Sequence, residues 1–403
     1  MQKLNNIFSN MFCKNNDYLS ILIYIDIKDL LSNSFILNYM NKIIMNNPIL
    51  KKTIIKINNN FYFNNITNFD MKDYYKIIYI ENKNFNKFNS IILNKNFDKD
   101  LKWKFYWLID KKLNKTRLYF KIHHLYVDGY KLINILITPL IKYELPLFKY
   151  ELPLFKRKQN NLFNTLYYCF IGTIILIIYN INIFINLLFY KKNLSKNLSK
   201  KLSENNISDH IICKSFDFDK IKKYTINNNI TINDFLYALM IKTDKIYTNI
   251  EKELIICSPI YIPCKSDIIN ATLLFNKINN SIDNNNLLKL INTKFNYYKF
   301  SLFIFIFNYI INYISKKIIN TITENIDYNF TNIIGPPLEN LKINIEDIHF
   351  LLKPKNKQII YNIISCNNNI NIICTFQKGI ITNKKKFKRS IYKAYNSLLN
   401  ECL

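Results

Sequence analysis

The chain has 403 residues, which is enough for one or two domains with cores of ordinary size. It carries 56 lysines and arginines against 28 aspartates and glutamates, a formal net charge of +28. The basic residues are spread along the chain, so a nucleic-acid-binding function rests on charge alone and is the weakest interpretation. The eight cysteines form no Cys-x-x-Cys pair and have no histidine at metal-ligand spacing, which argues against a zinc site.

The first hundred residues predict short elements joined by asparagine-rich turns. Residues 19–27, 50–57 and 77–80 have the apolar character of strands. Residues 29–46 favour a helix that ends before Pro48. This mixture predicts an α/β or α+β lobe. No cleavable signal peptide is visible at the N-terminus, so we expect reduced thiols on a cytosolic face.

The most informative stretch, residues 117–129, reads RLYFKIHHLYVDG. Apolar and polar side chains alternate over its first six residues, which predicts a half-buried strand, and the residues after Gly129 favour a helix. His123 and His124 therefore lie where a strand gives way to a loop, a common place for catalytic side chains. A neutral imidazole can take a proton from a hydroxyl near pH 7. One histidine would be that base while its neighbour packs into the scaffold.

Asp128 and Gly129 complete the spacing His-His-x-x-x-Asp-Gly. Asp128 would fix the loop or orient a partner, and Gly129 would leave room for a substrate. The alternative is structural: Asp128 only caps the following helix and the histidines are buried spacers. The chain has four histidines and four glycines, so this pattern arises rarely by chance.

An uncharged run covers residues 159–190, with basic residues on both sides at 156–158 and 191–192. A membrane-spanning helix needs about 20 apolar residues, so one tilted span is possible, and a buried core helix is the alternative. Because basic residues lie on both sides of the run, the positive-inside rule gives no preferred orientation in a membrane. A single membrane crossing would place the two lobes, and with them the two halves of an active site, on opposite sides of the membrane. We therefore favour a re-entrant or interfacial hairpin with its bend near residues 180–182.

Beyond the run, a second lobe begins with strand-like residues 211–218. The sequence TINDFLYAL at 231–239 opens a helix with good capping chemistry. Asn233 and Asp234 favour capping and hydrogen bonds between lobes over catalysis. Residues 384–399 predict a basic, amphipathic closing helix.

Three further positions in the second half are singular. Gly335 is one of the few glycines, which suggests a demanded backbone conformation, either in the wall of a substrate channel or in a strand-end turn. No other candidate functional residues stand near His210 or His349 in the sequence, so we expect both to be surface or structural residues.

The segment HHLYVDG is similar to the HHxxxDG signature of CoA-dependent acyltransferases and peptide-synthetase condensation domains. Further segments resemble the wax ester synthase/diacylglycerol acyltransferase family of O-acyltransferases. In family order these are NNPILKKTI at 46–54, a weaker match, then LKWKFYWLID at 101–110, TINDFLYAL at 231–239 and TNIIGPPLENL at 331–341. Lys102 and Ile334 stand where the family has proline.

The resemblance implies an α/β, two-lobe CoA-dependent acyltransferase fold like that of chloramphenicol acetyltransferase. Its lobes would be residues 1–158 and 191–403, with a membrane-associated apolar insertion at 159–190. A long-chain acyl group would pass from acyl-CoA, as co-substrate, to a fatty alcohol or diacylglycerol, giving wax ester or triacylglycerol. No permanently bound cofactor and no metal are expected.

The resemblance also implies roles for particular residues. The catalytic set would be His124 as general base, with His123 and Asp128 organising its loop. The expected substrate contacts are Gly129, Asn332, Gly335 and Pro336. The expected structural residues are Trp103, Asn233 and Asp234.

Membrane lipid is an expected partner and nucleic acid is not. The expected location is the endoplasmic reticulum or another internal membrane, with the active site facing the cytosol. Two alternatives stay open: an acyltransferase or condensation-type enzyme with another acceptor, and a catalytically inactive lipid-surface protein. The uncharged run weighs against a soluble-substrate enzyme, and the intact motif weighs against the inactive protein.

Overall fold

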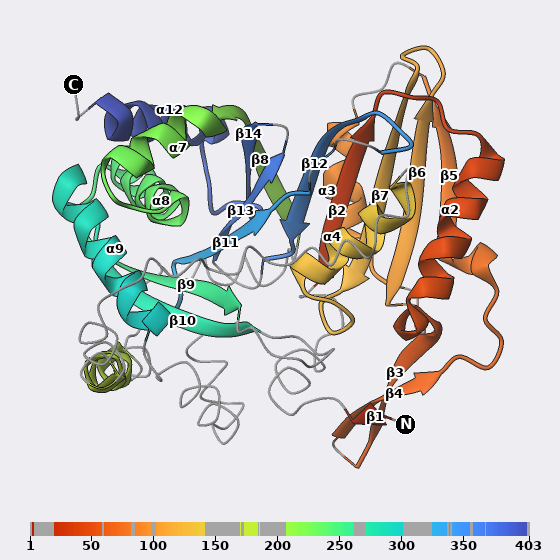
Figure 1. Cartoon of the computed structure of the whole chain (residues 1–403), viewed down its shortest axis with the longest axis horizontal. Coiled ribbons are helices and arrows are strands. Elements are labelled where there is room, and N and C mark those ends of the chain that lie inside the picture. Colours follow the sequence, from red (N-terminus) through yellow and green to blue (C-terminus); the bar gives the residue numbers. More distant parts are fainter. Residues whose placement is uncertain are drawn as a thin grey trace.

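Two sheets organise the protein, one in each lobe (Figure 1). The structure is a computed structural model, and it describes most of the chain. The described residues are 2–3, 20–58, 60–81, 85–97, 102–141, 170, 173–183, 185, 207–261, 271–300, 325–336, 338, 341–354, 358–366 and 368–400.

The first lobe is built on a five-stranded sheet in the order β12-β2-β7-β6-β5. Its strands are β2 (Ser20–Ile27), β5 (Tyr75–Ile80), β6 (Trp103–Asp110), β7 (Lys115–His123) and β12 (Ile345–Leu352). All neighbours are antiparallel except β5 and β6, which are parallel. Helices α2 (Asn33–Asn46) and α4 (Gly129–Ile137) share one apolar core with this sheet, and α3 (Asn86–Asn94) shares another.

The strand β7 has the predicted alternation but not the predicted exposure. Leu118, Phe120 and Ile122 point into the core shared with α2 and α4. Tyr119 and Lys121, on the other side, are buried as well. Helix α3 covers that side, and the Lys121 ammonium donates to the carbonyls at its end. The prediction of a half-buried strand is therefore wrong, because both sides of the sheet are covered.

A small sheet in the order β1-β4-β3 and three short 3-10 helices complete the first lobe. The strands are β1 (Gln2–Lys3), β3 (Lys52–Ile57) and β4 (Asn60–Asn65). The 3-10 helices are η1 (Pro48–Lys51), η2 (Met71–Tyr74) and η3 (Thr138–Leu140).

The second lobe has a six-stranded sheet in the order β10-β9-β11-β13-β14-β8. The strands are β8 (Ser208–Asp217), β9 (Glu253–Tyr261), β10 (Ala271–Asn279), β11 (Tyr328–Ile334), β13 (Ile359–Cys366) and β14 (Asn369–Gln377). Strand β11 runs parallel to β9 and β13, and the other neighbours are antiparallel.

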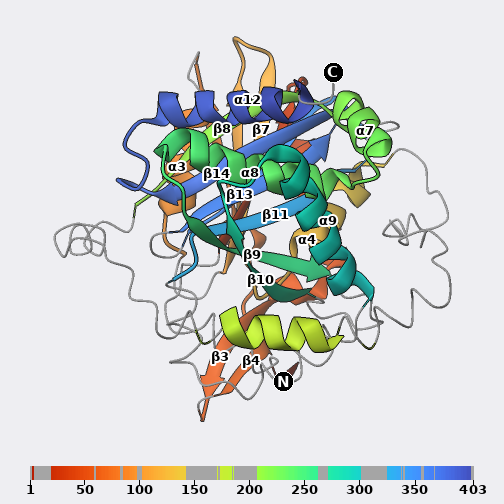
Figure 2. The same ribbon diagram turned by 90° about the vertical axis from the view of Figure 1, so that its left-hand side faces the viewer.

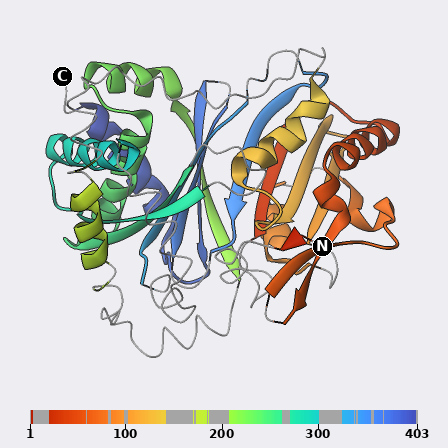
Figure 3. The same ribbon diagram turned by 60° about the horizontal axis from the view of Figure 1, so that its bottom comes forward.

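Four helices lie on the outer side of the second sheet (Figures 2 and 3). They are α7 (Phe218–Asn227), α8 (Ile232–Thr248), α9 (Asn284–Phe300) and α12 (Lys384–Asn400). One apolar side of α12 is fully buried against the lobe, through Phe387, Ile391, Ala394 and Leu398. The predicted closing helix is confirmed.

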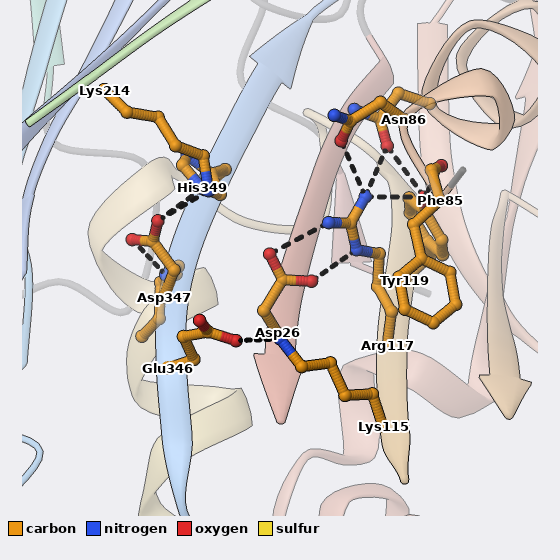
Figure 4. A network of polar contacts seen from close by, with 12 residues as sticks. Asp26, Phe85, Asn86, Lys115, Arg117, Tyr119, Lys214, Glu346, Asp347 and His349 are labelled. Carbon is orange, nitrogen blue, oxygen red and sulfur yellow. Dashed lines mark hydrogen bonds and ion pairs between the residues drawn. The ribbon is translucent and has the colours of Figure 1, made fainter. Parts of the chain in front are cut away.

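Strand β12 joins the lobes, because it comes from the second half of the chain and pairs with β2 in the first sheet. Asp347 on β12 accepts a hydrogen bond from Lys214 of β8 at 3.1 Å, and His349 Nε2 lies 2.9 Å from the same carboxylate (Figure 4). His210 of β8 lies 3.0 Å from the Ser90 hydroxyl of α3. Both isolated histidines are therefore structural residues where the lobes meet.

The uncharged run is described only in part. Residues 173–183 form a helix that continues through Asn180 and Asn182, so the predicted bend at residues 180–182 is wrong. Within the described ranges, no helix combines the length and the apolar character that crossing a membrane requires. The rest of residues 159–190 lies outside the described part of the chain.

Candidate active site

The HHxxxDG motif forms a tight loop between β7 and α4. The last strand residue, His123, receives the N–H of Tyr126 on its carbonyl at 3.1 Å, which turns the chain. Leu125, Tyr126 and Val127 are buried, and the Tyr126 hydroxyl donates to the carbonyl of Lys52 at 2.8 Å. The three middle residues of the motif therefore anchor the loop.

Asp128 caps helix α4. Its carboxylate accepts the backbone N–H of Lys131 at 2.7 Å, and Gly129 is the first helical residue. The capping role is confirmed, and it fixes the loop that carries the histidines. A capping role for Asp128 is compatible with His124 acting as a general base.

His123 is the scaffold histidine. It is 3% exposed, its Nδ1 accepts the N–H of Leu125 at 3.3 Å, and its ring lies against Phe97. Burial lowers the pKa of His123 to about 3, and the neighbouring His124 and Lys102 act in the same direction. His123 therefore stays neutral at physiological pH and holds the end of the strand.

His124 is only partly buried. Removal from water lowers its pKa below the ordinary value of 6.5, while its backbone hydrogen bond and the charge of Asp128 act against that shift. The imidazole is therefore mostly neutral at pH 7, which is the form that can accept a proton. This is the protonation state that a general base requires.

The second lobe meets the motif at Gly129. A Cβ atom on Gly129 would lie 2.4 Å from Cδ1 of Ile333, which belongs to β11. The glycine thus makes room for a side chain of the other lobe rather than for open space. Its contact with a substrate stays a prediction. An isoleucine in a strand gave no sequence signal, so Ile333 could not be singled out beforehand.

Asn332, next to Ile333, links β11 to the start of α8. Its amide donates to the Asn233 side-chain oxygen at 2.6 Å. Thr231 and Asp234 form a capping box, and the Asp234 carboxylate also accepts the Asn292 amide at 2.7 Å. Capping is confirmed for Asp234. The partners described for Asn332 and Asp234 belong to the second lobe, and the expected hydrogen bonds between lobes stay a prediction.

Gly335 is required by close packing between strands. A Cβ atom there would lie 1.8 Å from the backbone oxygen of Ser365 on β13. Among the described glycines, only Gly379 has a positive φ, so the expected special conformation at Gly335 is wrong. Pro336 is buried beside it. Substrate contacts of Asn332, Gly335 and Pro336 stay predictions.

Trp103 opens β6 and is buried. Its indole N–H donates to the carbonyl of Leu50 at 2.9 Å, and its ring packs 4.4 Å from that of Tyr74. These contacts agree with the structural role expected of it. Among the residues that the structure describes, no group of three or more histidines, cysteines and acidic residues could hold a metal ion.

Comparisons with known proteins agree with this architecture. Residues 292–399 match the family model of the WS/DGAT C-terminal domain. No curated protein sequence matches the chain.

Solved structures that are similar over nearly the whole chain include a wax ester synthase/diacylglycerol acyltransferase from Marinobacter aquaeolei VT8. It has 12% identity and a TM-score of 0.60, and all of both chains is covered. A trichothecene 15-O-acetyltransferase from Fusarium sporotrichioides has 10% identity and a TM-score of 0.64, with 99% of this chain and 94% of that chain covered.

The starter condensation domain of rhizomide synthetase, in complex with C8-CoA, is similar at 7% identity and a TM-score of 0.59. The match covers 95% of this chain and 89% of that chain. Likeness at such low identity shows the fold, and the predicted two-lobe α/β fold is confirmed.

Proposed function

We propose that this chain, whose residues 292–399 match the family model of the WS/DGAT C-terminal domain, is an O-acyltransferase. It would move a long-chain acyl group from acyl-CoA to a fatty alcohol or diacylglycerol. The observation that carries the proposal is the HHxxxDG loop at the end of β7, with β11 of the other lobe packed on Gly129. The fold shared with acyltransferases and condensation domains supports it.

In the proposed reaction, His124 takes the proton of the acceptor hydroxyl as that oxygen attacks the thioester carbonyl. A bond forms between the oxygen and the acyl carbon, and a tetrahedral intermediate results. Its collapse breaks the bond between carbon and sulfur. The proton then passes from the His124 imidazolium to the departing CoA thiolate, so the base is restored.

The cysteine thiols in the described part of the chain support direct transfer without an acyl-enzyme intermediate. Cys213, Cys257, Cys366 and Cys374 are all buried. Burial raises the pKa of the first three to about 12 and that of Cys374 as well, so none is the thiolate that nucleophilic catalysis needs. This supports the imidazole as the reacting group.

The acyl donor and the acceptor are supported unequally. The relative from Marinobacter is named as a wax ester synthase/diacylglycerol acyltransferase, and the condensation domain was solved with C8-CoA. These names support acyl-CoA as the donor and a lipid alcohol as the acceptor. Location at an internal membrane with a cytosolic active site belongs to the same proposal.

The test is incubation of the purified protein with radiolabelled palmitoyl-CoA and one acceptor at a time. Hexadecanol should give labelled wax ester, or diacylglycerol should give labelled triacylglycerol. A third arm with hexadecylamine examines the condensation-type alternative, because amide formation would move the protein to that class. Absence of any acyl product from folded protein would reject acyl transfer.

A further inference from the structure

A helix from the uncharged run, the surface helix (residues 173–183), lies beside the second lobe next to β10 and α9 (Figure 2, yellow-green). Its inner side is buried and partly polar. The buried residues of this side are Thr173, Leu176, Asn180 and Ile183. They recur every three or four positions, which places them along one side of a helix.

Polar contacts hold the surface helix in place. The Tyr179 hydroxyl accepts the backbone N–H of Lys277 at 2.9 Å and donates to the Lys277 carbonyl at 3.1 Å. The Lys294 ammonium donates to the same hydroxyl at 2.7 Å. The Asn180 amide donates to the Tyr298 hydroxyl at 3.3 Å. The helix is therefore fastened to the lobe by its polar residues.

The outer side of the surface helix is exposed and, apart from Asn182, apolar. Its exposed isoleucines, with the flanking Phe170 and Ile185, form what we call the apolar stripe: Phe170, Ile174, Ile175, Ile178, Ile181 and Ile185. Ile178 is 64% exposed and Ile174 is 55% exposed. An ordinary surface helix shows the opposite arrangement, with its apolar side inward. Contiguous exposed apolar surface of this kind marks an interaction site.

We propose that the apolar stripe docks the protein on an anionic lipid surface. At about 1.5 Å per residue the surface helix is roughly 16 Å long, far shorter than the ~30 Å hydrocarbon core of a bilayer, so it would lie along the surface. In the sequence, basic residues at 156–158 and 191–192 bracket the run that contains it. Basic charge together with exposed apolar side chains is the combination that binds anionic membranes.

Charge favours an anionic lipid surface over a second copy of the chain as the partner of the apolar stripe. Two copies would each bring a formal net charge of +28, whereas an anionic lipid surface brings the opposite charge. The inference deepens the proposed function, and its meaning for acyl transfer rests on that function: a docked enzyme would take its lipid acceptor from the surface on which it lies.

The first test measures sedimentation with vesicles of phosphatidylcholine and phosphatidylserine, and with vesicles of phosphatidylcholine alone. The test variant is Ile174→Glu/Ile178→Glu. The matched control is Ile226→Glu/Ile250→Glu, because these isoleucines are 65% and 59% exposed and the change in charge is identical. The stripe variant should bind the mixed vesicles on the order of 100-fold more weakly. The control should keep nearly all of the binding.

A second measurement locates the contact. Trp103 and Trp107 are both 1% exposed, so brominated phosphatidylcholine should leave their fluorescence unchanged. The variant Ile178→Trp places an indole on the stripe, and that fluorescence should be quenched by brominated vesicles. An unquenched indole, or equal binding by the stripe variant and the control, would overturn the proposal.

The outcomes separate this inference from the proposed chemistry. Transfer from hexanoyl-CoA to hexanol, both free in solution, should be the same in the stripe variant and the unchanged protein. His124→Ala should bind vesicles normally and fail to transfer. If Ile174→Glu/Ile178→Glu instead turns a dimer into a monomer without lipid, a second copy is the occupant and the lipid proposal is wrong.

Discussion

Helix α4 and the surface helix have similarly apolar sequences but opposite arrangements. The apolar residues of α4, among them Leu132 and Leu136, are buried in the core that α4 shares with the sheet and α2. In the surface helix, Asn180 and Tyr179 face the protein while Ile178 faces outward. The apolar content of a helix therefore does not by itself decide which side is buried. In the surface helix, the side that packs against the second lobe is the one whose polar residues find partners there.

The difference extends to function. The loop before α4 carries His124 and belongs to the proposed chemistry, whereas the surface helix belongs to the proposed contact with lipid. If that division is right, substitutions in the two regions should affect different measurements.

The largest effect is expected from His124→Ala. Removal of the proposed base should lower turnover with palmitoyl-CoA by roughly 100-fold or more. Thermal unfolding and vesicle binding should stay as they are, because His124 is only partly buried and lies outside the apolar stripe. Near-normal turnover would reject the assignment, and a loss of vesicle binding would break the division between the two regions.

The next effect concerns β11, the strand that the second lobe contributes to the motif region. Gly335→Ala should destabilise the protein by about 3 kcal/mol, because the added Cβ meets the backbone of Ser365. Gly129→Ala is the matched comparison and should cost no more than about 1 kcal/mol, since the side chain of Ile333 can move aside.

Urea unfolding measures both free energies. The double variant Gly129→Ala/Ile333→Val should recover most of what Gly129→Ala loses. Equal costs at the two glycines would show that β11 is not held as closely to β13 as described.

A smaller effect is expected from Tyr179→Phe in the surface helix. The hydroxyl contacts both the N–H and the carbonyl of Lys277, so its loss should cost about 1 kcal/mol. Hydrogen exchange at the Lys277 amide should become faster. Tyr79→Phe is a suitable control, because that tyrosine is exposed and lies in the first lobe. Unchanged exchange would mean that apolar contacts, not polar ones, dock the helix.

The smallest effect is in the pH profile. The pKa of His124 is lowered by burial, and the neutral imidazole is the active form. Activity should therefore fall only when the pH drops below the ordinary histidine value of about 6.5, and it should be level above that. A plot of kcat/KM against pH measures this. An acid limb centred above 6.5 would contradict a lowered pKa.

Local chemistry predicted the motif region well. Alternation identified β7, the position of Asp128 predicted a helix cap, and the spacing of apolar residues predicted α12. Each of these depends on neighbours within a few residues of the chain. Such signals can be read from one sequence.

What could not be predicted depends on distant partners. Asn180 was expected to lie at a bend. In the structure it lies within a helix, where its amide donates to the Tyr298 hydroxyl. Gly335 was expected to need a special backbone conformation, but the reason for glycine is the close approach of the Ser365 backbone. The strand β7 was expected to be half-buried because nothing nearby in the sequence shows that α3 covers Lys121.

The pairing of β12 with β2 has a consequence for synthesis. The first sheet lacks one edge strand until residue 352 has left the ribosome, although all its other strands are made by residue 123. During that interval β2 presents unpaired backbone groups, which can pair with other chains. A fragment that ends before β12 should therefore aggregate rather than fold, and nascent chains of this protein should depend on chaperones until translation is nearly complete.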